Sequence, residues 1–265
     1  MEIKRVVTLS FSPTGNTRKV VDAVAQAVGA EQLLELDRTC FDNRWTGAEL
    51  QAGDVAVLGV PVYYGRVPKL MVEFFRYIQA QAIPAVLVVT YGNRDYEDAL
   101  LELKEESVNH GFLPVAAGAF PAQHDLARKL AVGRPDEADL ALAAEFGKKA
   151  GELIRGTADV AALPLTVKGS FPYHPAADLP IAPATDSEKC VKCMLCQKNC
   201  PVQAINPLDP SEIDGWRCLD CTRCIQTCPT GAKYIGIAAL QEKIAIMEAM
   251  FATPKQPELF YATES

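Results

Sequence analysis

The chain has 265 residues, of which 49% are hydrophobic, and its formal net charge is −7 at pH 7. This length suits one domain with a smaller second one, or two modest domains. The negative charge argues against nucleic acid as a partner, and no apolar run approaches the ~20 residues of a membrane helix. The first ten residues enter a strand pattern without the cleavage site of a signal peptide, which predicts a cytoplasmic protein that is not bound to a membrane.

Strand and helix patterns alternate over residues 1–157. Short apolar runs predict strands at 6–11, 32–36, 54–60, 85–89 and 115–120. Apolar residues at helical spacing predict helices over 20–28, 68–78, 96–109 and 136–155. Because the fourth run is apolar throughout, its strand should be covered on both faces, as in a parallel sheet. We therefore expect a doubly wound α/β domain with a five-stranded parallel sheet.

The loop after the first predicted strand has the features of a phosphate-binding loop. It combines hydroxyl side chains, a glycine and a following helix N-terminus, whose free N–H groups attract anions. Its candidate ligand-binding residues are Ser12, Thr14, Gly15, Asn16 and Thr17. The loop is neither a Walker loop nor a G-x-G-x-x-G turn. An ordinary Ser/Thr helix cap would account for the same residues.

The loops after the third and fourth predicted strands lie at the same sheet edge, where open α/β sheets bind ligands. They carry four tyrosines, which suit a flat ring, although core packing would also account for tyrosines. The candidate ring-binding residues are Pro61, Val62, Tyr63, Tyr64 and Gly65 in one loop, and Thr90, Tyr91, Gly92, Asn93, Asp95 and Tyr96 in the other. Together the three loops predict a mononucleotide with a large aromatic head. His124 follows the fifth strand at this edge, and we favour ordinary hydrogen bonding over a ligand role for it.

Residues 158–185 contain five prolines, which predicts a semi-rigid linker. Residues 186–236 then hold eight of the nine cysteines, in one pattern that occurs twice. Each run reads C-x2-C-x2-C-x3-C and is followed by proline, the spacing of bacterial ferredoxins. In that arrangement the fourth cysteine of each run binds the cluster of the other run. The predicted ligands are Cys190, Cys193, Cys196 and Cys228 for one [4Fe–4S] cluster, and Cys218, Cys221, Cys224 and Cys200 for the other.

A disulfide framework and a zinc site are alternatives for these cysteines, but both fit the pattern less well. A disulfide framework needs an oxidising compartment, and zinc sites usually draw four ligands from two spaced pairs. Neither calls for a doubled four-cysteine run with proline after each fourth member. Cys40 has no Cys or His neighbour in the sequence and is expected to be a structural thiol.

Residues 237–265 follow the cysteine runs. Ala238 to Phe251 are predicted to form an amphipathic helix with Leu240, Ile244 and Met247 toward the protein. The polar tail from Thr253 onward is expected to be loose.

Both halves of the chain resemble known families. Residues 6–155 resemble flavodoxins, because the stretch from Ser12 to Thr17 stands where their FMN phosphate loop stands, and the loops at 61–66 and 90–96 stand where they flank the flavin ring. Residues 186–236 resemble two-cluster bacterial ferredoxins, which implies a small α+β domain. The whole chain is similar to fused flavodoxin–ferredoxin proteins of anaerobic microbes, which carry a Tyr-Gly-Asn-Arg-x-Tyr stretch like that at 91–96. Pro13 departs from the flavodoxin pattern and removes a backbone donor.

The resemblance implies noncovalent FMN, two [4Fe–4S] clusters and low-potential electron transfer. One expected function is that of an electron carrier between redox partner proteins. The alternative is a flavin-dependent reductase of a small molecule, such as a quinone or a nitro compound. The sequence shows no Cys/His or Ser/His/Asp arrangement for acid–base catalysis and no nicotinamide-binding turn, so we predict no catalytic side chains and favour the carrier. A cluster-based sensor would need a DNA-binding or signalling module, and the sequence shows none.

Overall fold

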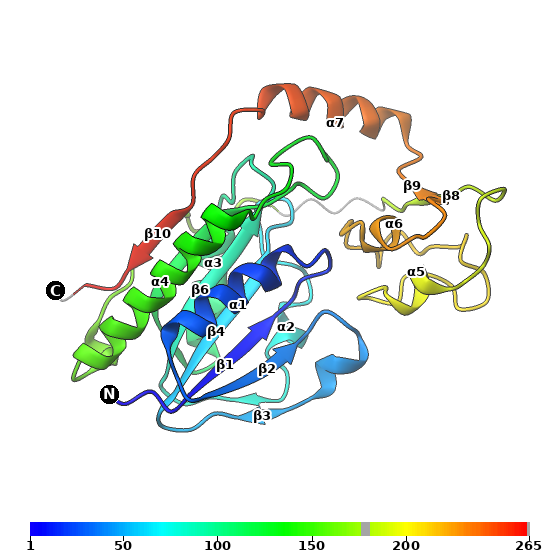
Figure 1. Cartoon of the computed structure of the whole chain (residues 1–265). Helices are drawn as coiled ribbons and strands as arrows, with labels where there is room; N and C mark the ends of the chain where they lie inside the picture. The colour runs from blue at the N-terminus through cyan, green and yellow to red at the C-terminus, as the bar shows by residue number, and fades with distance from the viewer. Residues whose placement is uncertain (176–180, 264–265) are drawn as a thin grey trace.

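A six-stranded sheet forms the centre of the larger part of the molecule (Figure 1). The computed structural model describes residues 1–175 and 181–263. Five strands run parallel in the order β2-β1-β4-β6-β7. They are β1 (Arg5–Ser10), β2 (Gln32–Asp37), β4 (Asp54–Pro61), β6 (Ile83–Tyr91) and β7 (Phe112–Pro121). Numbered among themselves they follow 2-1-3-4-5, the strand order of flavodoxin-like doubly wound folds. This confirms the predicted fold class.

Helices cover both faces of the sheet because its strands are apolar on both sides. On one face, α1 (Asn16–Val28) and α4 (Glu137–Gly156) pack against valines of β1, β4 and β6. On the other, α2 (Met71–Phe74) and α3 (Ala99–Asn109) pack against the alternate residues of the same strands. The helices α1 and α4 approach closely at Gly147, where a Cβ atom would lie 2.3 Å from the carbonyl oxygen of Val24.

Two expectations for this domain are corrected. The helix predicted over 68–78 is only α2, because Tyr77 adopts φ 60° and Ile78 enters β5 (Ile78–Gln79), which pairs with β3 (Ala48–Glu49). The tail is not loose either. Residues of β10 (Glu258–Tyr261) pair antiparallel with β7 and complete the sheet. Leu259 and Tyr261 pack against the α1–α4 side and Phe260 against the other, so the last strand is held by both cores.

The smaller part contains the two cysteine runs and little regular structure. Its elements are β8 (Ala184–Thr185), α5 (Leu195–Lys198), α6 (Arg223–Gln226) and β9 (Lys233–Tyr234), with β8 and β9 paired. Its buried apolar side chains are few and mostly small: Cys196, Pro201, Ala204, Ile205, Pro210, Cys221 and Ala232. A domain with so small a core needs another source of stability, such as bound metal.

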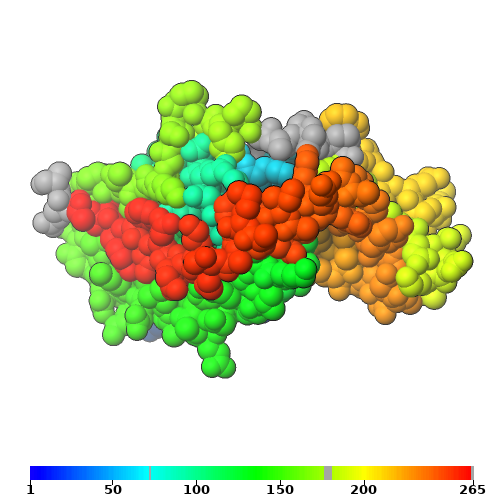
Figure 2. Space-filling view, turned by 90° about the horizontal axis from the view of Figure 1, so that it is seen from above, coloured from blue at the N-terminus to red at the C-terminus, as the bar shows by residue number. Residues whose placement is uncertain are grey.

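The helix α7 (Ala238–Met250) leads from this smaller part back to the sheet, crossing above the end of the larger domain (Figures 1 and 2). Short 3-10 helices, η1 (Asp42–Trp45) and η2 (Val160–Ala162), complete the described elements. Among the helices of residues 1–175 and 181–263, none has the length and apolar character needed to cross a bilayer.

Candidate functional site

A cavity of about 620 Å³ lies at the carboxyl edge of the sheet. It sits at the topological switch point, because α1 and α2, which follow β1 and β4, cover opposite faces of the sheet. Twelve of the candidate residues named from the sequence line this cavity: Thr14, Asn16, Thr17, Pro61, Val62, Tyr63, Tyr64, Gly65, Thr90, Tyr91, Gly92 and Asp95. Ser12, Gly15, Asn93 and Tyr96 were also candidates but do not line it.

The first loop divides its polar groups between structure and cavity. Gly15 has φ 85°, a conformation that glycine adopts easily, and starts α1. The hydroxyl of Ser12 accepts a hydrogen bond from the backbone N–H of Arg18 at 2.9 Å, so Ser12 satisfies one of the free N–H groups in the first turn of α1. Thr17 faces the cavity, and its hydroxyl lies 2.6 Å from that of Thr90. The loop therefore has two roles: Ser12 binds a free N–H group of α1, and Thr17 lines the cavity.

The four tyrosines of the other two loops also have different roles. Tyr63, Tyr64 and Tyr91 line the cavity. The Tyr96 ring packs against that of Tyr91, with 5.4 Å between centroids, and its hydroxyl donates to Glu258 at 2.7 Å. Tyr96 is therefore a core residue that fixes the last strand, as the core-packing alternative would have it.

His124 and Asp125 also line the cavity. Backbone N–H groups of Leu126 and Ala127 donate to His124 Nδ1 at 3.1 Å, which leaves the proton of the neutral ring on Nε2. Burial, together with the charge of Arg94, lowers the pKa of His124 to about 4, so the ring is neutral at pH 7. Burial raises the pKa of Asp125 to about 7. The signal in the sequence for both residues is their place after β7, at the edge where the ligand loops lie.

Four of the predicted cysteine ligands lie together in the smaller part of the molecule. Cys190, Cys193, Cys196 and Cys228 together line a second cavity of about 20 Å³. Burial is the main cause that raises the pKa of Cys218 to about 12. Within the described part of the chain, no group of His, Cys, Asp or Glu is arranged to hold a single metal ion. A [4Fe–4S] cluster differs, because each thiolate binds a different iron.

Backbone N–H groups point at the sulfur atoms. The N–H of Ala204 donates to Cys200 Sγ at 3.2 Å, and that of Ala232 to Cys228 Sγ at 3.3 Å. Although burial opposes it, hydrogen bonds led by the Lys233 N–H lower the pKa of Cys228 to about 7. Such N–H···S contacts stabilise thiolates and are one means by which proteins set cluster potentials.

The second cysteine run contacts the flavodoxin-like domain directly. Leu219 and Asp220, which lie between two of its cysteines, line the 620 Å³ cavity. Tyr64 donates its hydroxyl hydrogen to Asp220 at 2.8 Å, and Arg223 donates to the Pro13 carbonyl at 2.5 Å. The buried Arg44 donates to the carbonyl of Pro201. Cys221 is buried at this contact, whereas Cys193 of the first set is exposed.

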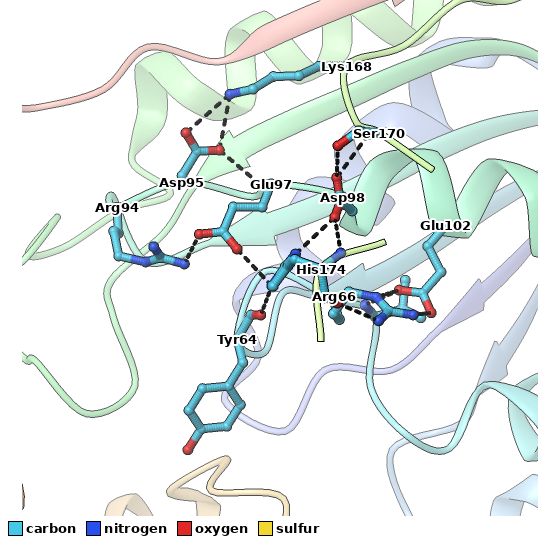
Figure 3. Close-up of polar contacts among 11 residues, drawn as sticks. Tyr64, Arg66, Arg94, Asp95, Glu97, Asp98, Glu102, Lys168, Ser170 and His174 are labelled. Carbon is cyan, nitrogen blue, oxygen red and sulfur yellow. Dashed lines mark hydrogen bonds and ion pairs between the residues drawn. The ribbon is translucent and has the colours of Figure 1, made fainter. Parts of the chain in front are cut away.

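The linker is attached at the same place. His174 lies between two carboxylates, with Nδ1 at 2.9 Å from Asp98 and Nε2 at 2.8 Å from Glu97 (Figure 3). Nε2 also lies 2.8 Å from the carbonyl oxygen of Tyr64, and Lys168 pairs with Asp95 at 3.0 Å. The hydrogen bond to Asp98 is the main cause of the raised pKa of His174. Residues 168–174 of the linker are thus docked on the loops of the cavity rather than only spacing the domains.

Comparison with known proteins supports the division into two parts. Residues 189–232 match the family model described as a 4Fe-4S dicluster domain. No curated protein matches the chain.

Solved structures align with the flavodoxin-like part. An oxidoreductase from Corynebacterium diphtheriae is 18% identical, with a TM-score of 0.43, over 60% of this chain and 100% of its own. A flavodoxin from the domain Archaea is 16% identical, with a TM-score of 0.40, over 58% and 99%. An NAD(P)H:quinone oxidoreductase from Methanothermobacter marburgensis is 10% identical, with a TM-score of 0.33, over 58% and 100%. Because these identities and TM-scores are low, the fold assignment rests on the strand order of the sheet and not on the similarity to these structures.

The chain thus joins a domain with flavodoxin-like topology to a 4Fe-4S dicluster domain, the combination found in flavodoxin–ferredoxin fusions. The 4Fe–4S domain gives the protein a redox role.

Proposed function

We propose that this protein passes low-potential electrons between two [4Fe–4S] clusters and FMN, and so links one-electron and two-electron carriers. One observation carries the proposal. The large cavity is lined both by the three loops of the flavodoxin-like domain and by Leu219 and Asp220 of the second cysteine run. A flavin held by the loops would adjoin the run that holds a cluster.

The residues of the cavity fit FMN. Thr14, Asn16 and Thr17 supply polar groups at the start of α1, where backbone N–H groups favour a phosphate. Tyr63, Tyr64 and Tyr91 supply aromatic walls for a flat ring. When bound, FMN accepts or donates electrons singly or in pairs, whereas a cluster transfers one at a time.

Each cysteine set has one buried member, Cys196 or Cys221, but of the eight cysteines only Cys193 is exposed, which supports an order of centres. Cys193 of the set at 190, 193, 196 and 228 is exposed, so we assign this centre to exchange with partner proteins. Cys221 of the other set is buried toward the flavodoxin-like domain, so we assign that centre to the inner position. Redox proteins that dock at the outer centre are the expected partners.

A reductase of a small molecule remains the second candidate. It is favoured by the apolar wall that Leu240, Ile244 and Met247 add to the cavity, since a planar apolar acceptor such as a quinone would pack there.

An anaerobic assay separates the two functions. The released flavin is first identified, and FMN is expected rather than FAD, because one short loop has no second site for an adenosine half. Chemically reduced protein is then mixed with a ferredoxin or with menadione. A carrier reduces the ferredoxin, and a matched variant that lacks the outer centre, C193A/C228A, does not. Single-turnover reduction of menadione that saturates with menadione concentration and is equally fast in this variant would support the reductase instead.

A further inference from the structure

Asn93 holds the C-terminal segment beside the cavity. It lies in the loop after β6 with φ 63° and is 1% exposed. Its side-chain amide donates to the carbonyls of Phe251 at 2.7 Å and Thr253 at 3.0 Å. Its side-chain oxygen accepts from the N–H of Lys255 at 2.9 Å. All three bonds go to residues 251–255, the segment that follows α7, and none to a residue that lines the cavity.

The helix that these bonds secure is otherwise weakly held. No residue of α7 is buried, and Leu240, Ile244 and Met247 turn their partly buried side chains to the cavity. Glu248 accepts from the backbone N–H of Lys129 at 3.1 Å and pairs with its ammonium group at 3.1 Å. Near the other end, Gln241 donates to the carbonyl of Ile235 at 2.7 Å. In Figure 2 the helix stretches as a band between the small domain and the tail.

A helix of this kind opens more readily than the core. Segments with few buried apolar contacts undergo local opening at low free energy while the rest stays folded. Here the attachments lie toward the ends of the helix, and its middle faces a cavity instead of a packed core.

We propose that α7 is a lid over the cavity and that Asn93 is the positioning residue that latches it. FMN then enters and leaves only when the latch opens, and the closed lid restricts which solutes reach the flavin. The inference rests on the proposed function for the identity of the cofactor, whereas the latch itself rests on the contacts of Asn93.

The latch has a kinetic signature that a binding residue lacks. Releasing a lid raises the association and dissociation rate constants together and leaves their ratio nearly unchanged. Losing a direct contact raises mainly the dissociation rate constant. Asn93 does not line the cavity, so its substitution is expected to show the first behaviour. Thr17→Ala, which removes a lining hydroxyl, is the reference for the second.

The experiment uses full-length protein with its clusters intact, reversibly depleted of FMN. Asn93→Asp keeps the shape and a left-handed backbone but loses both donors. Because the latch loses both of its donated hydrogen bonds, both rate constants should rise about tenfold, with a Kd change below about threefold. Stopped-flow quenching of FMN fluorescence gives the rates. Hydrogen exchange should also become faster across 238–250.

Two matched variants complete the test. Glu248→Gln weakens the pairing with Lys129 and should shift both rates in the same direction. Tyr96→Phe removes a bond to the tail at β10, away from α7, and should leave them unchanged. The proposal is overturned if Asn93→Asp raises only dissociation, or if exchange across α7 and both rates stay at the wild-type values.

Failure of the latch and failure of the proposed function give different results. If FMN binds the wild type and the variants show the same rate constants as the wild type, only the latch is rejected. Wild-type protein that binds no FMN rejects the proposed cofactor, and hydrogen exchange across α7 then decides on the latch alone.

Discussion

The crossed assignment of cysteines can be tested by substituting them in pairs. In the crossed arrangement Cys193 and Cys228 bind one cluster, and Cys200 belongs to the other. If each run instead bound its own cluster, Cys193 and Cys200 would share a centre. The structure supports the crossed sets, because Cys193 and Cys228 line the same small cavity.

The expected magnitude follows from these sets. Intact protein should contain about eight irons, four for each [4Fe–4S] cluster. The C193A/C228A variant removes two ligands of one centre and should keep about four irons. The C193A/C200A variant removes one ligand from each centre and should lose most of both. Each variant lacks two cysteines, so each controls for the general effect of removing thiols from a domain with a small core.

Iron and acid-labile sulfide are measured on anaerobically purified protein, with circular dichroism to check that the larger domain stays folded. The opposite pattern would refute the assignment: about four irons in C193A/C200A and almost none in C193A/C228A. An iron content near four in the intact protein would reject the two-cluster proposal itself.

Two further predictions concern the linker and the larger domain. Because His174 has a raised pKa, its stabilising contacts with Glu97 and Asp98 are fully present below the unfolded pKa of about 6.5 and are lost as the pH rises through the folded pKa. As the pH rises, the rate of hydrogen exchange over 168–175 should therefore increase by more than the intrinsic exchange rate does. A His174→Gln variant should lack this additional increase. Phe146 is fully buried and packs against β10, so Phe146→Ala should lower the free energy of unfolding by about 3–5 kcal/mol. Urea denaturation measures this, the exposed neighbour Glu145→Ala should change it by less than about 0.5 kcal/mol, and equal effects of the two would contradict the packing argument.

Local signals in the sequence were enough for much of the fold and for the cysteine sets. The apolar runs of β4 and β6 are long and strongly patterned, and the helix of α4 begins at Asp136 with a capping box. The cysteine spacing is specific because the short loops of each run can bring three thiolates to one cluster. The three loops of the cavity were found because parallel strands place their carboxyl ends at one edge.

Partners far apart in the sequence were not predictable in this way. Asn93 and Tyr96 belong to a loop whose neighbours line the cavity, yet their own partners are Phe251 and Glu258, more than 150 residues away. The apolar face of α7 was predicted to face the protein. The helical spacing of its apolar residues does not show whether that face contacts a packed core or a cavity. The short segment of β10 has no turn signal or length that would distinguish it from a tail.

The pairing of β10 with β7 also bears on the order in which the protein is built. The flavodoxin-like sheet receives its edge strand from residues that follow the whole dicluster domain. During synthesis from the N-terminus, the larger domain therefore emerges with an unpaired edge that is open to other strands. That edge closes only after the ribosome has completed the cysteine runs. Capture of β10 then holds the dicluster domain as an insertion with both ends anchored, so one proteolytic cut in the linker leaves it tethered to the sheet.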